Sequence, residues 1–123
     1  MAVASATAGT AQIGSDAFVV SVSGELDLSS VEPLERELDS VIGRGALRVI
    51  VDLTGVTFID SVSLGVLVRD AKRLRSNGGT CVVVVDDPRI RRVFAITGLD
   101  RIFVIERSLA EGVDRLVGRI ARA

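Results

Sequence analysis

Residues 47–61 read LRVIVDLTGVTFIDS, and this stretch decides the fold. Its first half, residues 47–53, is β-branched and mostly apolar, which is typical of a strand with both faces covered. A loop is expected over residues 54–59, followed by Asp60 and Ser61 at the start of a helix. That helix is predicted by apolar residues that recur three and four positions apart, namely Leu64, Leu67, Val68, Ala71 and Leu74. Residues 47–61 therefore connect a buried strand to a helix that packs on it.

Upstream of this unit, the sequence predicts another strand and another helix. Residues 18–23 are largely apolar and alternate in the manner of a strand. Ser29 and Glu32 have the spacing of a capping box, in which a hydroxyl and a carboxylate satisfy free N–H groups at a helix start. We therefore expect a helix that begins at Ser29 and ends at Gly43 or Gly45.

Downstream, the alternation continues to the end of the chain. Strands are expected over residues 81–85 and 102–105. A helix begins between them at Asp87, with Pro88 at an early helical position, and a last helix begins at Ser108. This alternation predicts the α/β class, with a mostly parallel sheet of four to five strands and about four helices packed on it.

The chain is expected to fold as one domain. Its 123 residues are too few for two independent cores. We expect the domain over residues 13–121, preceded by a flexible N-terminal tail over residues 1–12. The tail has no Lys or Arg and no apolar core, so it does not fit a signal peptide. No apolar run approaches the ~20 residues of a membrane span. The sequence therefore favours a cytoplasmic protein without a membrane partner. We expect it to be a monomer or a weak dimer.

The composition argues against several functions. With 15 Lys and Arg against 16 Asp and Glu, the net charge of −1 argues against non-specific nucleic-acid binding. The chain has no His, which removes the commonest general base and metal ligand. We expect no catalytic residue, no cofactor and no metal site, because no acid–base pair is evident. The one cysteine, Cys81, stands in an apolar run and is expected to be buried and unreactive.

The candidate site is the turn that ends the central strand and begins the next helix. In an open α/β sheet this edge is the usual place for function. Ser61 follows Asp60 there, where free N–H groups and the helix dipole favour negative charge, so a phosphate on Ser61 would be well accommodated. The alternative is that Asp60 and Ser61 only cap the helix, since both residue types are preferred there.

Three segments together resemble one family. They are residues 23–27 (SGELD), 51–61 (VDLTGVTFIDS) and 91–100 (RRVFAITGLD). In this order and at this spacing they resemble a STAS domain, and more narrowly the stand-alone anti-sigma-factor antagonists of bacteria.

The resemblance implies a regulator rather than an enzyme. Such antagonists bind an anti-sigma factor, often a serine protein kinase, and so free the sigma factor. The kinase phosphorylates the residue after the aspartate, the phosphorylated form is released, and a serine phosphatase restores it. Carried over to this chain, Ser61 is the acceptor. The loop that contains Asp27 is expected beside it, so that Asp27, Asp60, Ser61, Val62 and Ser63 form the partner-binding surface.

The chain departs from the family pattern directly after Ser61. The family usually has a second Ser or Thr and then Gly, whereas this chain has Val62 and Ser63. The departure leaves open a different partner, an acceptor shifted to Ser63, or the loss of phosphorylation. A STAS subunit of a non-sigma system, such as a lipid-transport complex or a stressosome-like scaffold, is the alternative function.

The sequence contains one basic cluster. It consists of Arg89, Arg91 and Arg92, with Arg101 nearby. A solvated helix face is the first interpretation, because no aromatic residues accompany the arginines to stack on bases. Binding of a partner or an anion is the second.

Overall fold

Strands and helices alternate along the chain as the sequence predicts. The computed structural model describes the backbone of residues 6–121 and the side chains of residues 6–117. The strands are β1 (Ala6–Gln12), β2 (Ala17–Leu26), β3 (Arg48–Ile59), β4 (Thr80–Val84) and β5 (Val104–Glu106). The helices are α1 (Glu32–Gly43), α2 (Ser61–Ser76), α3 (Pro88–Ile96) and α4 (Leu109–Ala121), with a short 3₁₀ helix η1 (Leu99–Arg101).

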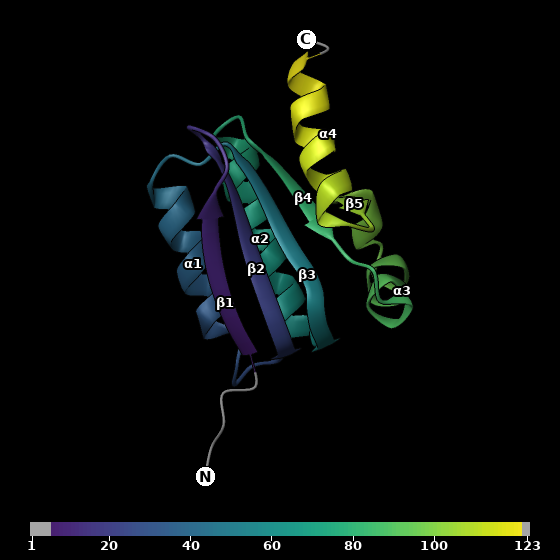
Figure 1. Ribbon diagram of the computed structural model, residues 1–123. Coiled ribbons are helices and arrows are strands. Elements are labelled where there is room, and N and C mark those ends of the chain that lie inside the picture. Colours follow the sequence, from purple (N-terminus) through teal and green to yellow (C-terminus); the bar gives the residue numbers. More distant parts are fainter. Residues whose placement is uncertain (1–5, 122–123) are drawn as a thin grey trace.

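The strands form one sheet in the order β1-β2-β3-β4-β5 (Figure 1). β1 pairs with β2 antiparallel, and the other pairs are parallel. The α/β class, the mostly parallel sheet and the number of strands and helices are therefore confirmed. Since β2, β3 and β4 run parallel, their carboxyl ends meet at one edge of the sheet.

Helices cover both faces of the sheet unequally. The larger core lies between the sheet and α1 and α2, and includes Val49, Val51 and Val83 from the strands. On the other face, Leu116 of α4 packs on a smaller cluster with Ile50 and Val82. Figure 1 shows α4 over the β4–β5 side of the sheet, opposite the side with α1 and β1. The nearly continuous apolar run at 47–53 follows from this arrangement, because successive residues enter different cores.

Two expectations about the sheet are wrong. Residues 6–12, expected as part of a flexible tail, form β1, while residues 1–5 lie outside the described residues. Its Ala, Thr and Gly residues give no apolar period, and β1 is held by backbone pairing to β2 and by burial of Ala6. Residues 54–59, expected as a loop, extend β3 to Ile59. This extension brings the end of β3 level with the end of β2, where Leu26 lies opposite Ile59.

Gly55 is what lets the extended β3 run close to β2. A Cβ atom at this position would lie 2.5 Å from the Ser23 Oγ and 3.1 Å from the Val22 carbonyl oxygen. The β2–β3 register also shifts between Ser21 and Ser23. A side chain at residue 55 would therefore push β2 and β3 apart just before the edge where the candidate site lies.

The predicted capping boxes have different outcomes. At α4, the Glu111 N–H donates to the Ser108 Oγ over 3.1 Å, so the predicted cap is confirmed. At α1, the predicted box is wrong: the N-cap is Val31, without a side-chain cap, and Ser29 bonds to Asp27 instead. The Ser29 hydroxyl takes part in the turn that precedes α1. Local turns of this kind compete with helix caps for the hydrogen bonds of Ser side chains.

Candidate functional site

Asp60 ends β3 and caps α2. Its backbone is extended, with φ −103° and ψ 177°, and its Oδ1 accepts a hydrogen bond from the Ser63 N–H over 2.9 Å. The predicted capping role of Asp60 is therefore confirmed. Ser61 is the first residue of the helix, and it is exposed.

Asp60 also ties the start of α2 to the loop between β2 and α1. Its Oδ2 accepts a hydrogen bond from the Leu28 N–H over 3.0 Å, and its own N–H donates to the Leu26 carbonyl over 3.0 Å. Leu28 is 32 residues away in the chain. Asp60 therefore does more than cap a helix, because its carboxylate bonds to backbone from two separate elements.

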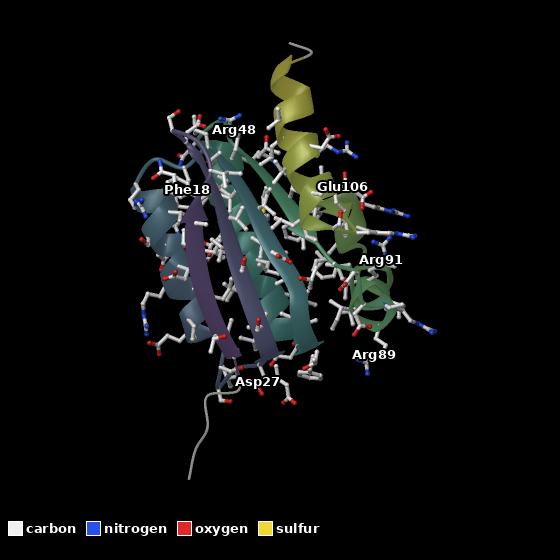
Figure 2. All side chains as sticks on the ribbon, viewed as in Figure 1. Phe18, Asp27, Arg48, Arg89, Arg91 and Glu106 are labelled. Carbon is white, nitrogen blue, oxygen red and sulfur yellow. The ribbon has the colours of Figure 1, made fainter. Side chains whose placement is uncertain are left out.

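Asp27 organises this same loop. Its Oδ1 accepts hydrogen bonds from the Ser29 N–H over 3.0 Å, from the Ser29 Oγ over 2.7 Å and from the Ser30 Oγ over 2.9 Å. Ser30 is buried, so the turn is anchored to the protein interior. Figure 2 shows Asp27 at the edge where β2 and β3 end, and the Leu28 N–H of the same loop donates to Asp60, so this loop lies beside the residue that precedes Ser61.

Both aspartates are held in their charged form. Hydrogen bonds from the Ser29 and Ser30 side chains lower the pKa of Asp27 below its ordinary value. The hydrogen bond from the Ser63 backbone N–H lowers the pKa of Asp60, although the nearby Asp27 charge opposes this. Both carboxylates therefore carry a negative charge at neutral pH, and that of Asp60 belongs to the residue directly before Ser61.

Val62 and Ser63, where the chain departs from the family pattern, differ in their exposure to solvent. The Val62 side chain is 43% exposed, whereas Ser63 is fully buried. The Ser63 Oγ has no hydrogen-bond partner among the described residues. A protein partner can therefore contact Val62 and Ser61 directly, while the Ser63 hydroxyl is closed to solvent.

Two exposed apolar side chains adjoin the site, and the sequence analysis assigned neither of them to the partner-binding surface. Leu28 is 73% exposed and Phe58 is 49% exposed. Leu28 donates its N–H to Asp60, and Phe58 precedes Asp60 by two residues in β3. Together with Val62 they form what we call the apolar rim of Ser61, defined as Leu28, Phe58 and Val62. The available signal was a large apolar residue inside a polar turn, Leu28 between Asp27 and Ser29.

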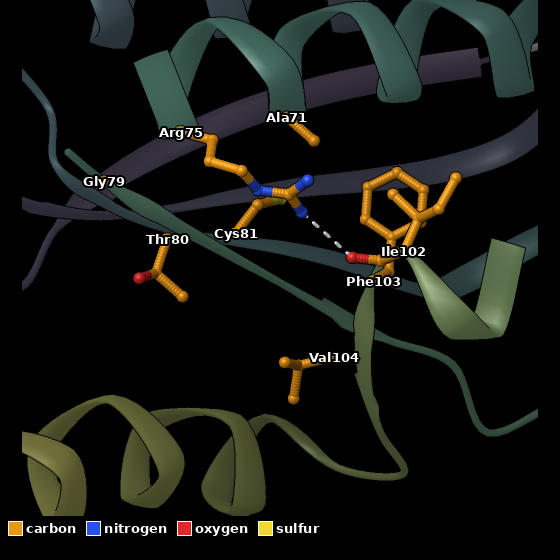
Figure 3. A pocket seen from close by; sticks show the side chains of 8 residues that line it. All are labelled: Ala71, Arg75, Gly79, Thr80, Cys81, Ile102, Phe103 and Val104. Carbon is orange, nitrogen blue, oxygen red and sulfur yellow. Dashed lines mark hydrogen bonds between the residues drawn. The ribbon is translucent and has the colours of Figure 1, made fainter. Parts of the chain in front are cut away.

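A separate cavity lies between the end of α2, β4 and the segment before β5. It has a volume of about 220 Å³, and Figure 3 shows the Arg75 guanidinium reaching across it to the Ile102 carbonyl, over 3.2 Å. Cys81 lines the cavity and is only partly buried as a residue, yet burial of its thiol raises its pKa to about 12. The thiol stays protonated at neutral pH, in agreement with the unreactive cysteine expected from sequence.

Neither a metal cluster nor a membrane-spanning helix is found in the described part of the chain. No group of three or more His, Cys, Asp or Glu side chains within residues 6–117 is placed to hold a metal ion. No described helix is long and apolar enough to cross a membrane.

The STAS domain family model matches residues 9–112, and the chain belongs to this family. It is 38% identical over 84 residues to an anti-sigma-B factor antagonist of Staphylococcus epidermidis, covering 68% of this chain and 78% of that protein. A crystal structure of an anti-sigma factor antagonist from Mycobacterium paratuberculosis superposes with a TM-score of 0.82 at 31% identity, covering 93% of this chain and 96% of the other. The phosphorylated form of the Bacillus cell fate determinant SpoIIAA shares the fold, with a TM-score of 0.71 at 22% identity, over 89% of this chain and 99% of that one.

Proposed function

We propose that this protein is an anti-sigma factor antagonist that binds an anti-sigma factor of the serine-kinase type and is released from it by phosphorylation of Ser61. The observation that carries the proposal is an exposed serine at a helix start, directly after the charged Asp60, whose carboxylate also binds the loop that contains Asp27 and the exposed Leu28. The names of the relatives support the antagonist role.

The apolar rim is suited to a protein partner. Large exposed apolar side chains that gather at one place on a surface are typical of interaction sites. Their burial by the partner supplies the binding free energy, while the fixed charges of Asp27 and Asp60 favour a partner that is basic at the contact. The partner we propose therefore places an apolar patch with a positively charged border over Ser61.

Phosphorylation would convert this surface from attractive to repulsive. The kinase transfers the γ-phosphoryl group of ATP to the Ser61 Oγ, ADP leaves, and the hydroxyl proton passes to a base of the kinase. The phosphate adds about −1.5 to −2 charge at pH 7. At the free helix start this charge is tolerated, but in a complex it would be desolvated beside two carboxylates. A serine phosphatase that hydrolyses the ester would restore the binding form.

Burial favours Ser61 over Ser63 as the acceptor. The Ser63 hydroxyl is fully buried, so a kinase could reach it only after the first turn of α2 had opened. Ser61 needs no such opening, because it is exposed at the surface.

The experiment is phosphorylation by candidate serine-kinase anti-sigma factors with Mg-ATP, read by intact mass and peptide mapping. We expect one phosphate on Ser61, none in Ser61→Ala, and unchanged phosphorylation of the matched control Ser63→Ala. A phosphate on Ser63 would contradict the acceptor assignment. Complex formation without any phosphate would keep the antagonist role and overturn the switch. Absence of both would favour a STAS subunit of a non-sigma system.

A further inference from the structure

A groove lies on the side of the molecule formed by α3, η1 and β5. Its volume is about 400 Å³, and it is lined by Arg91, Arg92 and Ala95 of α3, Asp100 of η1 and Ile105 of β5. None of these residues belongs to the surface around Ser61. Figure 2 shows Arg91 on this side of the molecule, across the sheet from β1.

Two arginines of the groove are not paired with a carboxylate among the described residues, although the Asp100 side chain also lines it. Within residues 6–117, neither Arg91 nor Arg92 has a carboxylate within 4.0 Å, and Arg91 donates only to the Val85 carbonyl, over 3.3 Å. Arg89 on the same helix differs, because its guanidinium is paired with Asp87 over 2.9 Å. Two arginines of the basic cluster are therefore available to an anionic group in the groove, and the third is not.

The groove is also bordered by β5, which is the outermost strand of the sheet. The Val85 N–H donates to the Glu106 carbonyl over 2.9 Å, so the backbone of Glu106 faces β4. In a parallel ladder, alternate residues turn their backbone groups to opposite sides, so the N–H and C=O of Ile105 point away from the sheet. An edge of this kind can accept one more extended strand.

We infer that this groove binds an extended acidic segment of a partner protein. The segment adds to the sheet beside Ile105 through backbone hydrogen bonds, and its carboxylates pair with Arg91 and Arg92. A peptide suits the groove better than a nucleic acid, because Ala95 and Ile105 are aliphatic and no lining residue is aromatic, which leaves bases without a stacking partner. This inference is independent of the role of Ser61.

The test uses the full chain labelled with ¹⁵N and two synthetic probes, an alternating Glu-Val hexapeptide and its Lys-Val counterpart. We expect the acidic probe alone to shift the amide signals of α3, η1 and β5, and to slow hydrogen exchange of the Ile105 amide. The double variant Arg91→Gln/Arg92→Gln should weaken this binding roughly tenfold or more, since charge-assisted pairs are lost. Arg89→Gln, a matched control on the same helix, should bind as the wild type does.

Four results would overturn the inference. The first two are the absence of any saturable shift with the acidic peptide up to about 1 mM, and binding of the Lys-Val peptide with the same affinity as the acidic one. The other two are an affinity of the double variant for the acidic peptide equal to that of the wild type, at unchanged thermal stability, and tighter binding of a single-stranded oligonucleotide than of the acidic peptide at the same residues. The last result would assign the groove to nucleic acid.

Discussion

The starts of α2 and α3 are built from the same local motif, but only one forms a candidate site. Each helix follows a strand and is capped by an aspartate, Asp60 or Asp87, whose Oδ1 accepts a backbone N–H of the first turn. At α3 the carboxylate of Asp87 is neutralised by Arg89, and a proline follows it. At α2 the carboxylate of Asp60 holds a distant loop, and an exposed serine follows it.

Under the proposed function, the surroundings of the α2 cap are what distinguish it as a regulatory site. At the α3 cap, the carboxylate charge of Asp87 is balanced by Arg89, and its hydrogen bonds reach only residues of the same helix. Among the described residues, the α2 cap has no cation paired with its carboxylate, it directly precedes the exposed Ser61, and it binds the Leu28 N–H of a distant loop. The first two predictions below change residues around the α2 cap and use the cap or the end of α3 as the control.

The largest expected effect on stability comes from removing the Asp60 carboxylate. Asp60→Ala should lower the free energy of unfolding by about 2 kcal/mol, because it removes a helix cap and the bond to the Leu28 N–H. Asp87→Ala should lose less, since only the local cap is removed. Urea unfolding followed by circular dichroism measures both, and equal losses would mean that the loop contact contributes nothing.

The apolar rim should matter for binding and not for folding. Leu28→Ala should weaken binding to the anti-sigma partner roughly tenfold, as expected for an exposed side chain buried at an interface. Ile96→Ala at the end of α3 is the matched control, since Ile96 and Leu28 are both 73% exposed in the free protein. Isothermal titration calorimetry gives both affinities, and a comparable loss in Ile96→Ala would move the docking surface away from Ser61.

The buried hydroxyl of Ser63 should be dispensable. Ser63→Ala should leave the free energy of unfolding unchanged or raise it by about 1 kcal/mol, because it removes a buried polar group without a partner and introduces the best helix former. Ser61→Ala, at the exposed neighbouring position, should change stability little. Thermal unfolding compares the two, and a clear loss of stability in Ser63→Ala would show that its hydroxyl is bonded.

The smallest effect is a dependence of stability on pH. Because the pKa of Asp60 is lowered in the folded state, its contribution is full above its unfolded value of about 3.9 and is lost as the pH falls through the folded value. The difference in unfolding free energy between wild type and Asp60→Asn should therefore be constant near neutral pH and shrink below about pH 4. A difference that grows on acidification would contradict the assigned hydrogen bonds.

The elements with strong apolar periodicity could be predicted from the sequence, and those held by backbone pairing could not. β3 and α2 follow from the apolar run at 47–53 and the spacing of Leu64, Leu67 and Leu74. β1 has no such pattern, because the edge of β2 holds it in place. Ser29 has a capping spacing, but its hydroxyl donates to Asp27 in the preceding turn, and the N-cap of α1 is Val31.

The same limit applies to the candidate site. Its position at the sheet edge and the capping by Asp60 could be predicted from motif and topology, whereas the expectation that the Asp27 loop lies nearby came from the family resemblance. The exposure of Leu28 and Phe58 and the burial of Ser63 could not, because they depend on how β2, β3 and α2 pack at the sheet edge. Burial separates Ser61 from Ser63, which sequence spacing alone leaves as alternatives.

The most direct test of the central claim is the affinity of the anti-sigma partner for the protein with and without a phosphate on Ser61. Calorimetry on the two purified forms should show tight binding of the unphosphorylated form and at least a roughly hundredfold loss after phosphorylation, as expected for a charge forced against two carboxylates at an interface. Circular dichroism of the two free forms should be the same. Equal affinities of the two forms, with the fold intact in both, would contradict the proposed switch at Ser61.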